Sequence, residues 1–112
     1  MIKSWTDAWR GMRAAWNTER NVRIEVIFII VFIVLAWILH APIIAVLIGV
    51  IALGTVLTAE LLNTAVEKLC DHLHPHEHDS IAKVKDIAAA GVLVSAVIAA
   101  VVCGLIILFS II

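Results

Sequence analysis

The stretch Ala59-Glu60-Leu61-Leu62-Asn63-Thr64-Ala65-Val66-Glu67-Lys68-Leu69-Cys70-Asp71 directly follows an uncharged apolar run, residues 41–59. On a helix, four of its polar side chains share one face: Glu60, Asn63, Glu67 and Asp71. Carboxylates at or near membrane depth are costly, so they are functional candidates. Two carboxylates two turns apart, with an amide between them, suit hard-cation binding and proton abstraction. The alternative is a helix that leaves the membrane and whose polar face is simply solvated.

Composition places the chain among small membrane proteins. Of its 112 residues, 63% are hydrophobic and 15% are charged, whereas soluble domains are about half apolar and a quarter charged. The net charge of -1 and the lack of a basic run give no indication of nucleic-acid binding. Cys70 and Cys103 have no CxxC spacing, so neither a disulfide framework nor a zinc site is indicated. We expect no cleavable signal, because charged residues are interspersed before the first long apolar run.

The N-terminal segment, residues 1–22, has the pattern of an amphipathic helix. An aromatic stripe recurs at helical spacing along it, formed by Trp5, Trp9, Met12 and Trp16. Tryptophan prefers the headgroup level of a membrane, and basic residues suit anionic lipid. The pattern therefore favours a helix that lies on the membrane surface; the alternative is a helix packed on the membrane bundle.

Three further helices that contain membrane spans are expected, at residues 24–40, 42–71 and 81–112. The chain is thus predicted to be an all-α integral membrane protein with a single domain, residues 1–112. The second helix continues its phase past the apolar run, so we expect it to be longer than the bilayer is thick. Residues 72–80 are predicted to form a loop, and the alternating histidines in it do not match helical zinc-ligand spacing, so a solvated loop is expected rather than a metal site.

The distribution of lysine and arginine predicts the orientation in the membrane. These residues precede the first span and flank the 72–80 loop, whereas the turn at residues 40–42 has none. The positive-inside rule then places the N-terminus and the 72–80 loop in the cytoplasm. Most of the conspicuous charges converge there: Glu19, Glu25, Glu60, Glu67, Asp71, Lys85 and Asp86. An enzyme that acts on a lipid headgroup and uses a water-soluble cosubstrate would need its site at this surface.

Two blocks of this sequence resemble the prokaryotic diacylglycerol kinase family. They are Glu60-Leu61-Leu62-Asn63-Thr64-Ala65-Val66-Glu67, followed by Asp71, and Ala82-Lys83-Val84-Lys85-Asp86-Ile87-Ala88-Ala89. The resemblance extends from about Trp9 to the last span. It implies a surface helix, three spans, a homotrimer in the bacterial cell (inner) membrane, and transfer of the γ-phosphoryl group of ATP to a lipid alcohol. Like that family, the chain lacks the glycine-rich phosphate loop of P-loop enzymes.

The resemblance also implies roles for individual residues. Glu60 would be the catalytic base that takes the proton of the lipid hydroxyl, and Glu67 and Glu19 would be ligands of Mg²⁺. The implied nucleotide-binding set is Glu19, Asn63, Glu67, Asp71, Lys85 and Asp86. Arg13 and His78 are further candidates for contact with nucleotide or substrate. These roles agree with the needs of phosphoryl transfer, namely a cation on the phosphates and a base on the nucleophile.

The lipid alcohol is the least determined part of the hypothesis. The stretches Thr18-Glu19-Arg20-Asn21-Val22-Arg23-Ile24 and Lys85-Asp86-Ile87-Ala88-Ala89 look like the Gram-positive-type branch, which favours undecaprenol over diacylglycerol. Undecaprenol is therefore the expected substrate and diacylglycerol the alternative. Two alternatives of other classes are a small proton-coupled transporter that uses Glu60 and a non-enzymatic, pore-forming assembly. The transporter gives no role to Lys85 and Asp86, and the pore-forming assembly leaves Glu19, Glu60, Asn63 and Glu67 unexplained.

Overall fold

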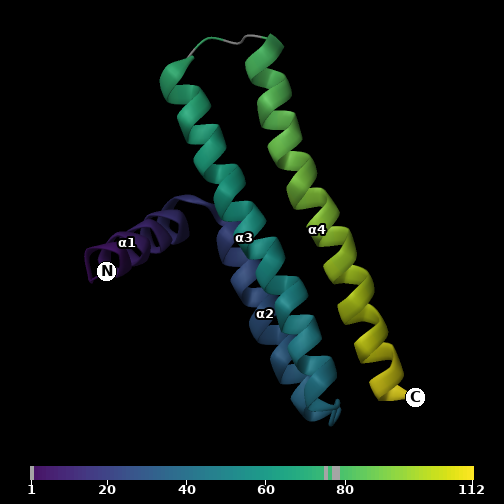
Figure 1. Ribbon diagram of the computed structural model, residues 1–112. Helices are drawn as coiled ribbons and strands as arrows, with labels where there is room; N and C mark the ends of the chain where they lie inside the picture. The colour runs from purple at the N-terminus through teal and green to yellow at the C-terminus, as the bar shows by residue number, and fades with distance from the viewer. Residues whose placement is uncertain (1, 75, 77–78) are drawn as a thin grey trace.

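The structure is a computed structural model that describes residues 2–74, 76 and 79–112, and this part of the chain is helical almost throughout. Its helices are α1 (Ile2–Thr18), α2 (Arg20–Ile38), α3 (Ile43–Leu73) and α4 (Asp79–Ile111). Helices α2, α3 and α4 lie side by side as an antiparallel bundle, and α1 leaves it at a steep angle part of the way along α3 (Figure 1). The expected all-α membrane architecture is confirmed.

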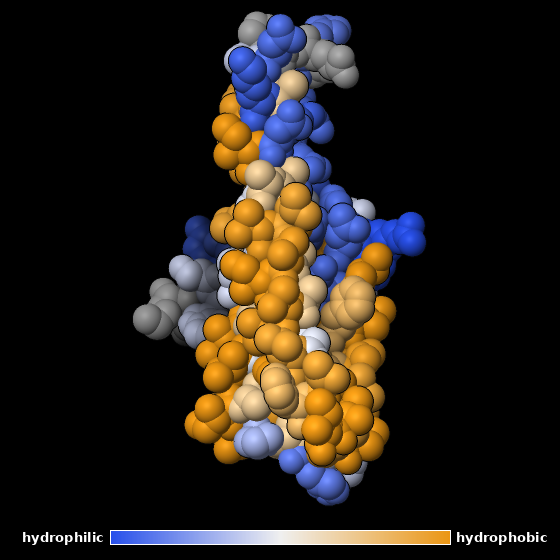
Figure 2. Space-filling view, turned by 90° about the vertical axis from the view of Figure 1, so that its right-hand side faces the viewer, coloured by the Kyte–Doolittle hydropathy of each residue, from blue (hydrophilic) through white to orange (hydrophobic). Residues whose placement is uncertain are grey.

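The three bundle helices are long and apolar enough to cross a membrane. At about 1.5 Å per residue, the 19 residues of α2 match a bilayer core of about 30 Å, whereas the 31 residues of α3 and the 33 of α4 exceed it. On the face that α4 presents, hydrophobic residues cover most of the length, and hydrophilic residues gather at the end where α3 and α4 are joined (Figure 2). The excess length of α3 and α4 therefore forms a polar end beyond the apolar band.

Most of the tryptophan stripe of α1 is exposed, and its C-terminal part borders Val26 of α2. Trp5 is 74% exposed and Trp9 is 67% exposed, whereas Ala15 is buried. Indole rings in such positions suit the headgroup level of a bilayer, with the small residues turned toward the protein. The structure thus favours a surface helix over a helix whose aromatic face packs on the bundle.

The break between α1 and α2 lies at Glu19, a few residues earlier than the sequence analysis placed it. Glu19 has an extended backbone (φ -116°, ψ 111°), so the chain changes direction at this residue. The last turn of α1 is closed by local contacts: Thr18 Oγ1 donates to Ala14 O at 2.7 Å, and Arg23 Nη1 donates to Trp16 O at 2.6 Å. The bond from Arg23 satisfies one of the carbonyls that a helix end leaves unpaired, and it ties the start of α2 to the end of α1.

A tight turn joins α2 to α3. His40 has a positive φ of 56°, and two backbone bonds close the helix end, from His40 N to Trp37 O (3.2 Å) and from Ala41 N to Ala36 O (2.9 Å). This pattern is a Schellman motif, in which the residue after the C-cap takes the left-handed conformation. Pro42 then precedes α3 with a φ suited to a helix start. The turn is what makes α2 and α3 antiparallel neighbours.

The bundle core is small and packed through small residues. It is formed by Phe32, Ala36, Leu53, Val56 and Ala99. A Cβ at Gly49 would lie 2.2 Å from Cζ of Phe32, so glycine is required where the phenyl ring crosses α3. Cys103 Sγ lies 3.8 Å from Gly49 O, and both cysteines are free. Within a membrane, helices associate through such close van der Waals packing rather than through the hydrophobic effect.

Candidate active site at the polar end of the bundle

The polar face of α3 is buried at its start and exposed farther along. Glu60 is 5% exposed, Asn63 8% and Thr64 7%, whereas Glu67 and Asp71 are exposed. A face that merely dissolved in water would not bury a carboxylate and an amide within a single chain, because burial of unpaired polar groups is costly. The structure therefore favours a built site over the solvated face that the sequence also allowed.

Glu60 is contacted from α2. Asn21 Nδ2 donates to Glu60 Oε1 at 3.4 Å, and Glu25 lies one turn farther along α2. The sequence analysis did not single out Asn21 as a site residue. No pattern could have done so, because 39 positions separate it from Glu60.

Asn63 and Glu67 form a second unit on the next turn of α3. Asn63 Nδ2 donates to Glu67 Oε1 at 3.1 Å. Because an ionised carboxylate only accepts, this bond fixes which way the amide is turned. Asn63 Oδ1 is buried and has no hydrogen-bond partner among the described residues. An oxygen in this state is open to a donor or cation brought by a ligand.

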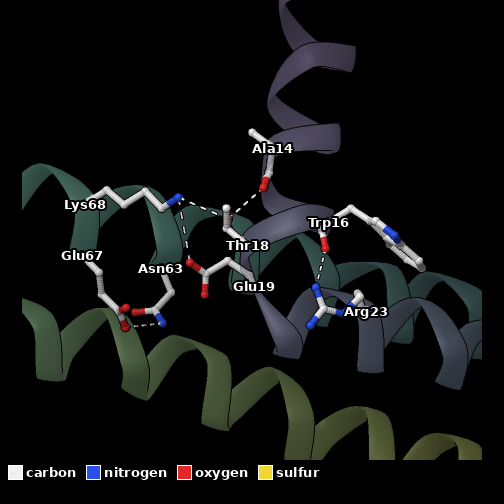
Figure 3. Close-up of polar contacts among 8 residues, drawn as sticks. All are labelled: Ala14, Trp16, Thr18, Glu19, Arg23, Asn63, Glu67 and Lys68. Atoms are coloured by element: carbon white, nitrogen blue, oxygen red, sulfur yellow. Dashed lines mark hydrogen bonds and ion pairs between the residues drawn. The ribbon is translucent and has the colours of Figure 1, made fainter.

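Glu19 is held at the same level from the α1–α2 junction. Lys68 Nζ lies 3.9 Å from Glu19 Oε1 and 3.4 Å from Thr18 Oγ1, so α3 is tied to the junction (Figure 3). Asn63 and Glu67 lie on the same stretch of α3 as Lys68, so two segments of the chain contribute to this end of the bundle. Lys68 is a further residue that the sequence analysis did not assign to the site.

The remaining candidates lie on the exposed end. Lys85 of α4 donates to Asp71 of α3 in a short ion pair, and Asp86 is exposed beside it. Arg13 lies on α1, where it lines a cavity of about 300 Å³ with Trp9, Met12 and Trp16 of α1 and Val26 of α2. His78, the last candidate, lies outside the described residues.

Taken together, these side chains offer one buried carboxylate, several exposed carboxylates, an amide with a free oxygen, and two lysines. Among the described residues, no group of three or more His, Cys, Asp or Glu side chains is arranged to hold a metal on its own. Mg²⁺ is usually bound by one or two carboxylates together with substrate phosphates. Fold and site define an integral-membrane protein with an acidic site at the polar end of its bundle.

Comparison with known proteins identifies the family. Residues 6–108 match the prokaryotic diacylglycerol kinase family, and the chain belongs to it. It is therefore a membrane lipid kinase that uses ATP as phosphate donor. Its bacterial relatives and its three apolar helices agree with a multi-pass membrane protein.

Three relatives show the breadth of the match. The chain is 36% identical over 104 residues to a diacylglycerol kinase of Synechocystis, covering 93% of this chain and 59% of that protein. It is 32% identical over 110 residues to a diacylglycerol kinase of Escherichia coli, covering 98% and 89%. It is 32% identical over 101 residues to an undecaprenol kinase of Bacillus subtilis, covering 90% and 82%. The relatives thus carry two different substrate names.

Proposed function

We propose that this protein transfers the γ-phosphoryl group of Mg-ATP to the hydroxyl of undecaprenol at the cytoplasmic face of the membrane. The observation that carries the proposal is the burial of Glu60 next to a more exposed charged ridge at the polar end of the bundle, formed by Glu67, Lys68, Asp71 and Lys85. A carboxylate at the edge of the apolar band can meet a lipid hydroxyl, while the ridge beyond it can meet a soluble nucleotide.

Glu60 is proposed as the general base. The lipid oxygen loses its proton to the Glu60 carboxylate as it forms a bond to the γ-phosphorus, and the bond from that phosphorus to the leaving oxygen of ADP breaks. An apolar groove of about 490 Å³ between α2, α3 and α4 has Glu25 among its lining residues. A hydrocarbon tail in this groove would place its hydroxyl beside the base.

Glu67 and Glu19 are proposed to hold Mg²⁺, and their surroundings fit a hard cation. Both side chains offer carboxylate oxygens, and the nearby Asn63 Oδ1 is a buried oxygen with no hydrogen-bond partner among the described residues. With two protein carboxylates as ligands, Mg²⁺ would keep coordination positions for phosphate oxygens, which is the usual arrangement for this ion. When bound, Mg²⁺ neutralises the charge of the phosphates.

Lys85, Asp71 and Asp86 are proposed as nucleotide contacts. Lys85 and Asp71 are paired in the structure, so the lysine is held at the ridge rather than extended into solvent. An ammonium group in this place can bind phosphate, and the two carboxylates can accept from the nucleotide's hydroxyl or amino groups. Arg13 and His78 remain candidate contacts.

Undecaprenol is proposed over diacylglycerol because of the Gram-positive-type stretches at residues 18–24 and 85–89. We expect the purified protein in mixed micelles to phosphorylate undecaprenol at least about 10-fold more efficiently than diacylglycerol, the discrimination that pocket contacts commonly give. Transfer of radiolabelled phosphate from ATP to both lipids, side by side, measures this ratio. A preference for diacylglycerol would overturn the substrate assignment and leave the kinase assignment intact. The family match does not support the transporter or pore-forming alternatives.

The proposed location is the bacterial inner membrane, with the N-terminus and the α3–α4 connection in the cytoplasm. The support is the position of the basic residues, all at one end of the bundle or on α1: Lys3, Arg10, Arg13, Arg20, Arg23, Lys68, Lys83 and Lys85. In a background without Cys70 and Cys103, a membrane-impermeant maleimide added to intact spheroplasts should label Ile112→Cys and spare His76→Cys. The reverse result would invert the orientation.

The proposed assembly is a homotrimer. In a single chain, only 6% of the most apolar window of α4 is buried, which leaves most of this helix available to lipid or to another subunit. Native mass spectrometry in detergent should give three times the mass of 12.2 kDa. A monomer or dimer that retains full activity would exclude the trimer.

A further inference from the structure

The proposed function gives no role to the contact between Asn21 and Glu60. Asn21 is the second residue of α2, two positions after the break at Glu19. Its Nδ2 lies 3.4 Å from Oε1 of Glu60, whose side chain is almost entirely buried. Among the described residues, this is the hydrogen bond that the structure gives to the Glu60 carboxylate.

We propose that Asn21 is a positioning residue for Glu60, and this inference rests on the proposed role of Glu60 as general base. A carboxylate that only accepts must be met by the amide nitrogen, so Asn21 restrains Oε1 and leaves Oε2 for the hydroxyl of the lipid. Proton transfer requires the base to lie within hydrogen-bond reach of the proton that it removes. Asn21 therefore selects the orientation in which Glu60 faces the substrate.

A neutral donor suits this task better than a charged one. Lysine or arginine in this place would stabilise the ionised carboxylate strongly and so weaken it as a base. An amide holds the carboxylate without adding charge. The pair thus keeps Glu60 both oriented and reactive.

The α1–α2 junction fixes the amide in space. Arg23 donates to Trp16 O at 2.6 Å, and Lys68 of α3 reaches Thr18 and Glu19 (Figure 3). These contacts on both sides of Asn21 hold the first turn of α2 against α3. One junction therefore carries a proposed metal carboxylate, Glu19, and the residue that orients the base.

The test compares three substitutions at position 21 with one matched control. Asn21→Leu keeps the side-chain shape and removes the donor, Asn21→Asp adds a charge that faces Glu60, and Asn21→Gln retains an amide. Asn17→Leu removes an exposed amide from α1 without touching Glu60. For each variant, kcat and the KM for Mg-ATP are measured with saturating lipid, together with the thermal melting midpoint and the oligomer mass.

We expect Asn21→Leu to lower kcat by roughly 10- to 100-fold, the usual cost of a misplaced catalytic group, with the KM for Mg-ATP unchanged within about twofold. Asn21→Asp should lower kcat further, and Asn21→Gln should recover part of it. Asn17→Leu should resemble the wild type. A purely structural role would instead lower the melting midpoint and change kcat and KM together.

Several results would overturn the inference. They are full kcat in Asn21→Leu, a loss of kcat that parallels a loss of stability, an equal loss in Asn17→Leu, or no recovery in Asn21→Gln. Glu60→Gln tests the role of Glu60 as general base separately from the positioning role of Asn21. If Glu60→Gln is inactive and Asn21→Leu is fully active, only the role of Asn21 fails. If Glu60→Gln is itself active, the base assignment fails and the role of Asn21 fails with it.

Discussion

Glu60→Gln is expected to lower turnover by about 10³-fold, within the 10²- to 10⁴-fold range of a lost general base. The glutamine amide keeps the shape of the side chain and can still hydrogen-bond to Asn21, but it cannot take up the proton of the lipid hydroxyl. Initial rates of lipid phosphorylation at saturating Mg-ATP and lipid measure this loss.

The informative control for this variant is its nucleotide affinity. Glu60 is buried, whereas Glu67, Asp71 and Asp86, which are proposed to bind the nucleotide, are exposed. Glu60→Gln should therefore bind Mg-ATP with the wild-type affinity and unfold at the wild-type melting midpoint. Asp7→Asn, which neutralises an exposed carboxylate of α1 that pairs with Arg10, should leave turnover unchanged. Near-normal turnover in Glu60→Gln would show that another group removes the proton.

Glu67→Gln is expected to raise the KM for Mg-ATP and lower kcat together, each by at least about 10-fold, because an amide oxygen is a much weaker ligand of Mg²⁺ than a carboxylate. The new side chain can still accept from Asn63, so the local structure should persist. A titration of Mg²⁺ at fixed ATP checks the cause, since a weakened metal site should be partly restored by excess metal.

The contrast between the two glutamine variants assigns the roles. Rescue by Mg²⁺ is expected for Glu67→Gln and not for Glu60→Gln, because only the first loses a metal ligand. Equal behaviour of both variants in the Mg²⁺ titration would contradict the division into base and metal ligand. Wild-type kinetics of Glu67→Gln at limiting Mg²⁺ would remove Glu67 from the metal site.

The local sequence pattern was sufficient to predict the helices and the face of α3 that carries the site residues. Apolar runs without charge must become helices in lipid, because no water is present to satisfy the backbone, and α2, α3 and α4 follow from this. The spacing of Glu60, Asn63 and Glu67 alone places them on one face of a helix, and the Asn63–Glu67 bond at 3.1 Å lies within that one helix.

The boundary at Glu19 shows where pattern reasoning loses precision. Charged residues occur before the break, at Arg13, and after it, at Arg20 and Arg23. Hydropathy therefore does not distinguish the end of the surface helix from the start of the first span. At the turn, Arg23 of α2 donates to the carbonyl of Trp16 at the end of α1. Such side-chain-to-backbone bonds depend on geometry that composition does not record.

The sequence by itself determined that this protein is a helical membrane protein with an acidic face on one helix, because both properties depend on residues within a few turns of each other. Only the tertiary structure decided that Glu60 is buried, that Asn21 bonds to it, and that Lys68 ties α3 to Glu19. These contacts join residues 39 or more positions apart, so they exist only after α1 and α2 have packed against α3. Burial, too, is a property of packed neighbours, and it is what distinguishes a built site from a solvated face.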